Sequence, residues 1–382
     1  MSAANVKWSP QQVGGISTAR GWLMQCAAEL RQGRRLSQPI LRIFGFAGTG
    51  KTTIARHLAD GADGPTCYCA FTGKAALMMA RNGCHGASTI HGLIYQVKEG
   101  RNGATRFVLD KASPAASAAL IVVDECSMVD EELALDLMSF GRPILVLGDP
   151  AQLPPVKGAG YFINAEPDVM LTEIHRQARD NPIIAMATLI REGGHLELGT
   201  YGASRVIERG VLSPEDVKAA DQILVGKNAT RTAYNRRMRS IYGFTDPLPM
   251  KGDRLVCLRN DKSLGIFNGG LFTVDSGLLR PDPDLTNCIK FEVRSEDFKR
   301  KAALAVNVRR EFFEGAADDI PWQELRGTQQ FDFGYALTCH KAQGSQWDDV
   351  IVYDESGTFR EDAQRWLYTA LTRAAKRVTV VV

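Results

Sequence analysis

The chain has 382 residues, which is too long for one compact core and suits two domains with an insertion. Its hydrophobic content of 45% and charged content of 23% are typical of an ordinary soluble globular protein, and a net charge of +3 does not by itself indicate a nucleic-acid partner. The start, MSAANVKWSPQQ, has no apolar targeting core and no run of 18 apolar residues occurs, so we expect no export signal and no membrane span.

In the first part of the chain, short apolar runs alternate with helical patterns. Strands are predicted at residues 41–46, 66–71, 119–123 and 144–147. Helices are predicted between them at residues 54–58, 75–81 and 131–140. This alternation predicts an α/β fold with a parallel sheet that helices cover on both faces.

A short polar hairpin interrupts this pattern. The stretch YQVKEGRNGATRFVL, residues 95–109, contains two β-prone runs around Asn102-Gly103. Both turn residues tolerate the positive φ that a tight turn needs, so the dipeptide is a strong hairpin signal. We therefore predict a first domain of residues 1–165 with a β-hairpin insertion at about residues 95–112.

The second part of the chain repeats the α/β pattern and then departs from it. Strands are predicted at residues 223–225, 335–337, 350–353 and 378–382. Between them, residues 250–331 form short β segments broken by Gly, Asn and Pro, which predict a small β-barrel. A second α/β domain of residues 166–382 is thus expected to carry this barrel as an insertion.

The stretch GFAGTGKT, residues 45–52, fits the phosphate-binding pattern G-x-x-x-x-G-K-[ST] and lies between a predicted strand and a predicted helix. Its glycines let the backbone wrap round a phosphate with N–H groups pointing inward. Lys51 is expected to neutralise the β- and γ-phosphate oxygens of ATP, and the Thr52 hydroxyl to ligate Mg²⁺. The residues predicted to bind the nucleotide here are Gly48, Thr49, Gly50, Lys51, Thr52 and Thr53.

Two adjacent acids, Asp124 and Glu125, follow the apolar strand predicted at residues 119–123. Successive strand residues point to opposite faces, but at the end of a strand both side chains can face the nucleotide. Asp124 is expected to hold Mg²⁺, and Glu125 to orient and polarise the attacking water.

Three further stretches narrow the type of P-loop protein. LGDPAQLPPV places Gln152 at a third strand end, where its amide can sense a γ-phosphate. EIHRQ contains Arg176 and YTALTRA contains Arg373. An arginine supplied by another domain can stabilise the charge that develops in phosphoryl transfer. The predicted catalytic set is therefore Lys51, Glu125, Gln152, Arg176 and Arg373.

The chain resembles the superfamily 1 class B helicases, specifically their RecD-like and Dda-like group, from about residue 8 to residue 382. The motifs that carry the resemblance are, in order, GFAGTGKTT, AFTGKAA, ASTIHGLIY, VVDECSMVD, LGDPAQLPPV, EIHRQ, YALTCHKAQGSQWDDVIV and YTALTRA. The resemblance implies two RecA-like P-loop NTPase domains with parallel sheets, ATP in the cleft, single-stranded DNA across their tops and 5′ to 3′ translocation. It also implies that the inserted barrel is SH3-like.

The resemblance assigns roles to single residues. Gln12 looks like the glutamine that reads adenine, His175 falls where relatives stack an aromatic ring on the base, and Gly344 matches a nucleotide-binding position. Gln346 departs from the acidic residue by which relatives are thought to read ribose. The residues that match DNA contacts are Thr72, Gly73, Lys74, Thr89 and His91 in the first domain and Thr338, His340 and Lys341 in the second.

In the family, the position of the hairpin insertion holds a pin that parts the strands of a duplex. The tip of the present hairpin, residues 100–103, has no apolar side chain to stack on a base pair. We therefore hypothesise a blunt steric wedge, with Arg101 and Arg106 near backbone phosphates.

The expected protein is a cytoplasmic, monomeric helicase from a bacterium or a phage-infected cell. Its partners would be single-stranded and forked or tailed duplex DNA, and replication or repair proteins. The scattered cysteines are expected to be free thiols, since none forms a Cys-x-x-Cys pair. A GTPase is disfavoured, because the chain has no Asn-Lys-x-Asp base reader.

Two other interpretations stay open. RNA or an RNA–DNA hybrid could serve as the track, since nothing in the sequence reads a 2′-hydroxyl unmistakably. A DNA-binding ATPase clamp that does not unwind would share the same motifs.

Overall fold

Two units make up the chain in the computed structural model, which describes residues 7–99, 105–154, 160–174, 180–261, 264–280, 282, 283, 285, 287–296 and 302–382. By internal contacts, the first unit comprises Met1–His195 and Gln364–Thr372, and the second comprises Leu196–Ala363 and Arg373–Val382. The chain thus leaves the first unit later than the boundary that we predict at residue 165. The boundary lies later because the strand at Val169–Leu171 pairs with the first sheet. A helical segment near the end of the chain, Gln364–Thr372, also belongs to the first unit.

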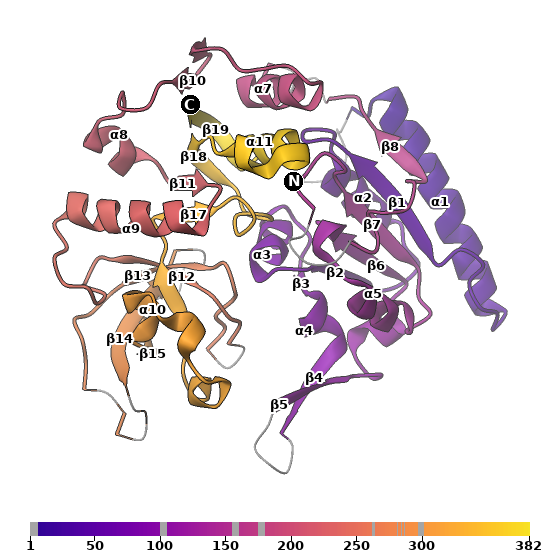
Figure 1. Cartoon of the computed structure of the whole chain (residues 1–382). Coiled ribbons are helices and arrows are strands. Elements are labelled where there is room, and N and C mark those ends of the chain that lie inside the picture. The colour runs from indigo at the N-terminus through magenta and orange to yellow at the C-terminus, as the bar shows by residue number, and fades with distance from the viewer. Residues whose placement is uncertain are drawn as a thin grey trace. The chain divides into compact units, whose positions relative to one another are not determined.

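The first unit is built on a six-stranded parallel sheet in the order β3-β2-β6-β7-β1-β8 (Figure 1). The strands are β1 (Ile40–Gly45), β2 (Thr66–Ala70), β3 (Ser88–Thr89), β6 (Leu120–Asp124), β7 (Ile144–Gly148) and β8 (Val169–Leu171). The four strands predicted for this half of the chain are confirmed to within one residue at each end.

Seven α-helices belong to the described part of the first unit. They are α1 (Pro10–Arg31), α2 (Lys51–Asp60), α3 (Gly73–Arg81), α4 (Ile90–Ile94), α5 (Glu131–Met138), α7 (Pro182–Arg191) and α11 (Ala363–Leu371). Throughout the described ranges of the chain, no helix is both long enough and apolar enough to cross a membrane.

Alternate residues of one strand enter two different cores. Leu120 and Val122 of β6 pack with the buried faces of α1, α2 and α3. Ile121 and Val123 of the same strand pack with α4 and α5. Because successive side chains of a strand point to opposite faces, these two cores confirm that helices cover both faces of the first sheet.

The predicted hairpin is present as β4 (Tyr95–Glu99) and β5 (Thr105–Leu109), which pair antiparallel from Tyr95↔Leu109 to Glu99↔Thr105. Figure 1 shows it extending beyond α4, away from the first sheet. Its tip, residues 100–104 with Arg101, lies outside the described residues, as does the side chain of Arg106.

The second unit contains a six-stranded sheet in the order β17-β11-β18-β19-β10-β9, parallel except for the antiparallel edge strand β9. The strands are β9 (Gly199–Tyr201), β10 (Ser204–Ile207), β11 (Gln222–Val225), β17 (Ala336–Thr338), β18 (Trp347–Tyr353) and β19 (Ala374–Val381). The helices α8 (Pro214–Ala219) and α9 (Asn228–Tyr242) accompany it.

The central strands β18 and β19 begin several residues before the apolar runs that predict them. Their first halves carry charged residues, so an apolar pattern cannot reveal them. In the sheet these charges face one another, since Arg377 bonds to Asp349 and the Lys376 ammonium lies 2.8 Å from Asp348. Because opposite charges on neighbouring strands attract, the charged first halves of β18 and β19 can pair as part of the sheet.

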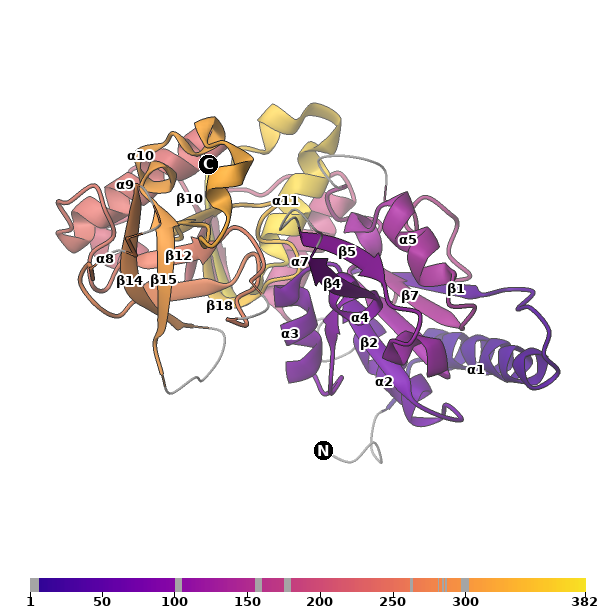
Figure 2. The same cartoon turned by 90° about the horizontal axis from the view of Figure 1, so that it is seen from below.

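The β segments predicted at residues 250–331 are present as an antiparallel sheet in the order β15-β14-β13-β12-β16, whose last strand ends at Phe333 (Figure 2). A bridge between Val308 and Gln329 brings the outer strand β15 beside the segment that leads into β16. The sheet shares one hydrophobic core with α9 and the second parallel sheet. The elements are β12 (Arg254–Cys257), β13 (Leu271–Val274), β14 (Cys288–Ser295), β15 (Leu304–Arg309), α10 (Glu311–Glu314) and β16 (Phe331–Phe333).

A buried ion pair attaches the insertion to α9. Asp253, which is 0% exposed, accepts hydrogen bonds from the Arg239 guanidinium at 2.9 Å and from the Tyr335 hydroxyl at 2.9 Å. The Met250 amide also donates to this carboxylate at 2.8 Å. A buried charge is tolerated when it is paired and fully hydrogen-bonded, as here.

Asp253→Ala should therefore lower the free energy of unfolding by about 3–5 kcal/mol, because it leaves the Arg239 charge buried without a carboxylate. Urea unfolding followed by circular dichroism measures the change. Asp348→Ala is the matched control, since it removes an exposed ion pair of the same unit and should change stability little. Similar losses in the two variants would contradict the role of the buried pair.

Candidate functional site

The loop between β1 and α2 has the geometry of a phosphate-binding loop. Gly48 and Gly50 have φ values of +78° and +83°, a region that favours glycine. A Cβ on Gly45 would lie 2.7 Å from the Thr49 hydroxyl oxygen, so the loop needs glycine there as well. Gly50 caps α2 without a side-chain hydrogen bond, and the first N–H groups of the helix therefore remain available to an anion.

Lys51 lies over this loop. Its Nζ donates to the carbonyl oxygens of Gly45 at 2.6 Å and Phe46 at 3.2 Å. Its positive charge favours the ionised forms of Asp124 and Asp149, at the ends of β6 and β7. The ammonium group thus lies against the loop that is predicted to bind phosphate, and its role in phosphate binding stays a prediction.

Thr52 and Asp124 meet at the start of α2, where the threonine hydroxyl donates to Asp124 Oδ2 at 3.1 Å. Burial and, to a smaller extent, the charge of the neighbouring Glu125 together raise the pKa of Asp124 to about 6, against the opposing effect of Lys51. Oxygen ligands of this kind suit Mg²⁺. Thr52 and Asp124 are therefore the residues that could hold such an ion at this position.

Glu125 has a left-handed backbone, with φ 52° and ψ 52°, which is uncommon for a residue other than glycine. Its N–H donates to Asp124 Oδ1 at 2.9 Å, so the turn is fixed by the preceding carboxylate. The negative charge of Glu125 raises the pKa of both Asp124 and Asp149. Strained conformations cluster at functional sites, and here the strain brings a third acid to the two strand ends.

Asp149 and Tyr368 form a link that the sequence analysis does not assign. The Tyr368 hydroxyl in α11 accepts from the Ala47 N–H at 2.9 Å and donates to Asp149 Oδ2 at 2.7 Å. Burial raises the pKa of Asp149. Asp149 could have been found, because it is an acid at a predicted strand end like Asp124. Tyr368 could not, because it is distant in the sequence.

Gln152 lies beside this link and is 9% exposed. Its backbone N–H donates to the Asp149 carbonyl at 3.2 Å, and the next residue, Leu153, donates to the Thr369 hydroxyl of α11 at 2.8 Å. Its side-chain Oε1 is buried and has no hydrogen-bond partner among the described residues. A buried acceptor without a donor is costly, so this amide is suited to a water or ligand that reaches the site.

Gln12 contacts the phosphate-binding loop directly. Its Nε2 donates to the Thr49 carbonyl at 2.9 Å, and its Oε1 accepts from the Ser9 N–H at 3.0 Å in the cap of α1. The side chain is 2% exposed. Adenine recognition by Gln12 would require it to exchange one of these bonds, and it stays a prediction.

The predicted DNA contacts of the first unit lie around the ends of β2 and β3, which pair at Ala70↔Thr89. Thr72 and Thr89 use their hydroxyls to cap α3 and α4. Gly73 follows Thr72 as the first residue of α3. His91 lies in a group of rings with Phe71, Tyr95 and the 56% exposed Phe107 at the base of the hairpin.

Lys74 fits the role of a DNA contact least well, because it is 5% exposed. A phosphate contact needs an accessible ammonium group, so this role requires Lys74 to become uncovered.

The predicted contacts of the second unit follow β17. The Lys341 N–H donates to the Thr338 hydroxyl at 3.3 Å, and the His340 ring lies 5.7 Å from that of Phe359. Burial lowers the pKa of His340 and of Lys341.

Arg373 and Gly344 also come together in the second unit. The Arg373 guanidinium donates to the Ser345 carbonyl at 3.3 Å, directly after Gly344, whose φ is +73°. His175 and Arg176 lie outside the described residues.

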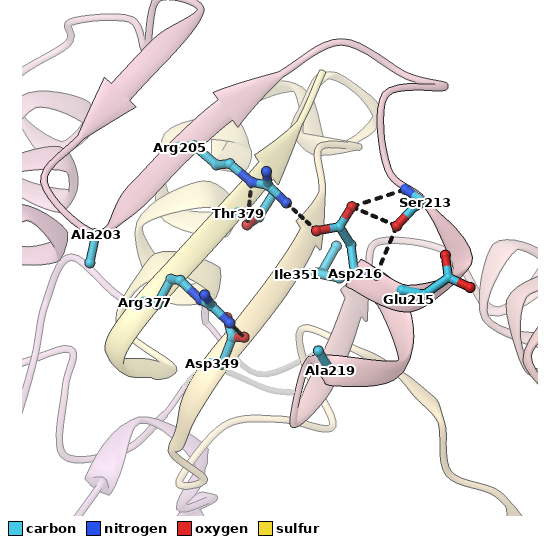
Figure 3. Close-up of a pocket in the computed structure, with 10 residues that line it drawn as sticks. All are labelled: Ala203, Arg205, Ser213, Glu215, Asp216, Ala219, Asp349, Ile351, Arg377 and Thr379. Atoms are coloured by element: carbon cyan, nitrogen blue, oxygen red, sulfur yellow. Dashed lines mark hydrogen bonds and ion pairs between the residues drawn. The ribbon is translucent and has the colours of Figure 1, made fainter.

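A pocket of about 470 Å³ on the second sheet contains none of the predicted site residues (Figure 3). Arg205 pairs with Asp216 at 2.9 Å on one side of it, and Arg377 pairs with Asp349 on the other. Each arginine already has a carboxylate partner, so we assign no chemistry to this pocket.

Two family models match the chain. Residues 30–211 match an AAA domain, and residues 333–381 match a UvrD-like helicase C-terminal domain. The two matches cover the segments that carry the phosphate-binding loop and the predicted Arg373 motif.

Curated relatives are similar over most of the chain. The ATP-dependent RecD2 DNA helicase of Deinococcus radiodurans is 30% identical in an alignment 373 positions long that covers 87% of this chain and 45% of that protein. The RecBCD enzyme subunit RecD of Mycobacterium tuberculosis is 26% identical in an alignment 422 positions long that covers 91% of this chain and 67% of that protein. The chain therefore spans less than half the length of the Deinococcus relative.

Solved structures share the fold at low sequence identity. Bacteroides Pif1 bound to single-stranded DNA has a TM-score of 0.56 and 17% identity, with 98% of this chain and 92% of that chain covered. The Pif1 helicase from Candida albicans has a TM-score of 0.53 and 19% identity, with 99% and 94% covered. At such identities the likeness shows the α/β fold of these helicases.

Asp124→Asn should stabilise the nucleotide-free protein at pH 8. The folded pKa of Asp124 is raised from 3.8 to about 6, so the stabilising contribution of the protonated acid is lost as pH rises through that window. At pH values above this window, the ionised carboxylate of Asp124 destabilises the folded state. The neutral amide of the variant removes about 1–3 kcal/mol of that destabilisation. Urea unfolding at pH 5 and pH 8 measures the gain, which should be smaller at pH 5.

The exposed Asp348→Asn serves as the control and should show no such window. If Asp124→Asn does not raise the free energy of unfolding at pH 8, or raises it more at pH 5 than at pH 8, the cost assigned to burying the Asp124 carboxylate is contradicted.

Proposed function

The chain belongs to the superfamily 1 class B helicases of the RecD-like group, and from that membership we propose that it is an ATP-dependent DNA helicase. The observation that carries the proposal is that Lys51, Thr52 and Asp124 meet at the N-terminus of α2, which has no side-chain cap. The Deinococcus relative is named an ATP-dependent DNA helicase, and the Bacteroides neighbour is described as bound to single-stranded DNA.

In the proposed hydrolysis, the amides of residues 48–53 bind the β-phosphate and Lys51 neutralises the β and γ oxygens. Thr52 and Asp124 would hold Mg²⁺, which supplies further neutralisation of phosphate charge. Glu125 orients the attacking water and accepts its proton. The Gln152 amide donates to the γ-phosphate through Nε2, which leaves its orphan Oε1 for a water.

The remaining nucleotide contacts follow the family pattern. Arg176 and Arg373 are proposed to stabilise charge on the transferred phosphoryl group. Gln12, His175 and Gly344 are proposed to surround the base and ribose. Of these, Gln12 has support from its position against the phosphate-binding loop.

We propose that the motor moves 5′ to 3′ on single-stranded DNA as a cytoplasmic monomer, with replication or repair proteins as possible partners. In the first unit, the DNA backbone would meet Thr72, Gly73, Lys74, Thr89 and His91, where helix N-termini offer N–H groups. In the second unit it would meet Thr338, His340 and Lys341. Short polar side chains with few cations allow a contact to form and break at each step.

Two insertions complete the proposed machine. The antiparallel sheet at residues 250–331 is proposed to be an SH3-like barrel, which its five strands and the Val308–Gln329 bridge support. The β4–β5 hairpin is proposed to be the pin that parts a duplex, with Arg101 and Arg106 near phosphates. Its extension away from the first sheet supports this role (Figure 1).

Duplexes of one sequence with either a 5′ or a 3′ single-stranded tail test the direction of movement. With ATP and Mg²⁺, we expect strand separation only from the 5′ tail, measured by loss of quenching of a labelled strand. Lys51→Ala is the control and should reduce DNA-stimulated ATP hydrolysis by about 100-fold or more. Separation only from the 3′ tail would refute the class B direction, and equal separation of an RNA duplex would favour the RNA interpretation.

Replacement of residues 99–104 by a two-residue turn tests the pin. A wedge is needed to part strands but not to hydrolyse ATP, so unwinding should fall at least about tenfold while DNA-stimulated ATP hydrolysis stays within twofold. Both rates are measured on the same tailed duplex. Unchanged unwinding would show that the hairpin is only a surface loop.

A further inference from the structure

A second group of charges lies at the carboxyl edge of the second sheet. β11 and β17 are neighbours there and pair at Val225↔Thr338. Arg231 belongs to the first turn of α9, which follows β11, and Lys341 follows β17. Open α/β sheets bind ligands at the carboxyl ends of their strands, so this edge is a place where a binding group is expected.

Arg231 is only partly satisfied in this position. Its Nη2 lies 2.9 Å from Asp332 Oδ2 on β16, and the two side chains are 17% and 19% exposed. Its Nε is buried and has no hydrogen-bond partner among the described residues. A buried guanidinium N–H without an acceptor is costly, and an anion that approaches the 17% exposed side chain and reaches this N–H would satisfy it.

Arg239, on the same helix, shows what a purely structural arginine looks like. Its Nε and Nη2 both donate to Asp253, and Nη2 also donates to the Leu248 carbonyl at 2.8 Å. All of its guanidinium nitrogens therefore have acceptors, since Nη1 donates to Pro247 at 3.4 Å. Arg231 lacks this completeness although it is also paired with one carboxylate.

The charges around Arg231 do not balance. Two cations, Arg231 and Lys341, act on the single carboxylate of Asp332. Burial lowers the pKa of Lys341, and the charge of Arg231 lowers it further, so the two cations disfavour each other. Burial also raises the pKa of Asp332 in spite of both cations. A half-buried group with one excess positive charge is stabilised by an external anion.

We propose that Arg231 and Lys341 together bind one backbone phosphate of single-stranded DNA, and that Asp332 limits the strength of this contact. The inference rests on the proposed function, and it adds Arg231 as a phosphate-binding residue and Asp332 as a positioning residue. An arginine donor and a lysine ammonium suit a phosphodiester, because it offers two non-bridging oxygens that share one negative charge. The competing carboxylate makes the contact reversible, as a motor that releases its track at each step requires.

The test compares Arg231→Gln with Asp332→Asn in binding to a labelled oligothymidine, measured by fluorescence anisotropy over a series of salt concentrations. Loss of one phosphate contact should weaken binding several-fold and reduce the slope of log K against log salt by about 0.7. Asp332→Asn should act in the opposite direction and tighten binding, because it removes the competing charge. Arg236→Gln, at an exposed position of the same helix, should leave affinity and slope unchanged.

Equal weakening by Arg231→Gln and Asp332→Asn would overturn the inference, since it would show that the ion pair is only structural. An unchanged salt slope in Arg231→Gln would also overturn it. If circular dichroism shows that Arg231→Gln is unfolded, Arg231→Lys is tested in its place. This variant should keep the wild-type slope of log K against log salt and bind oligothymidine more weakly. Failure of the wild-type protein to bind oligothymidine would instead refute the proposed DNA helicase function. The experiment therefore distinguishes failure of the proposed function from failure of the inference about Arg231.

Discussion

The site depends on the parallel pairing of β1, β6 and β7. Because parallel strands end at the same edge, the register Phe44↔Gly148 and Val123↔Val146 brings the phosphate-binding loop, Asp124 and Asp149 together. Helices bury both faces of the sheet, so polar groups can be placed only at its edge. Charge then accumulates there, and burial raises the pKa of both aspartates.

One tyrosine joins this edge to the last part of the chain. The Tyr368 hydroxyl contacts both the Ala47 amide of the phosphate-binding loop and Asp149, while Thr369 contacts the Leu153 amide next to Gln152. The phosphate-binding loop and the segment that carries Gln152, the proposed γ-phosphate sensor, are therefore both attached to α11. The chain passes from α11 through Thr372 to Arg373 and the second unit, so a proposed catalytic arginine directly follows the element that contacts the phosphate-binding loop.

Buried charges in the second unit fall into two kinds. Arg239 and Asp253 satisfy each other and attach the β insertion to α9, which is a structural use of charge. The second group has two cations, Arg231 and Lys341, but only one carboxylate, that of Asp332. One of its guanidinium N–H groups has no acceptor among the described residues. The number of partners, rather than the depth of burial, distinguishes the two groups.

The sequence alone determined the parallel first sheet, the hairpin and the β character of residues 250–331, and it identified the acids and lysine that are proposed to form the nucleotide site. These features depend on local spacing, since apolar runs, turn residues and the phosphate-binding motif act within a few positions. Tertiary structure alone decided the attachment of Tyr368 to Asp149, the assignment of Val169–Leu171 to the first sheet and the incomplete pairing of Arg231. These features join residues that are distant in the sequence, and only packing determines which charges and hydrogen-bonding groups find partners.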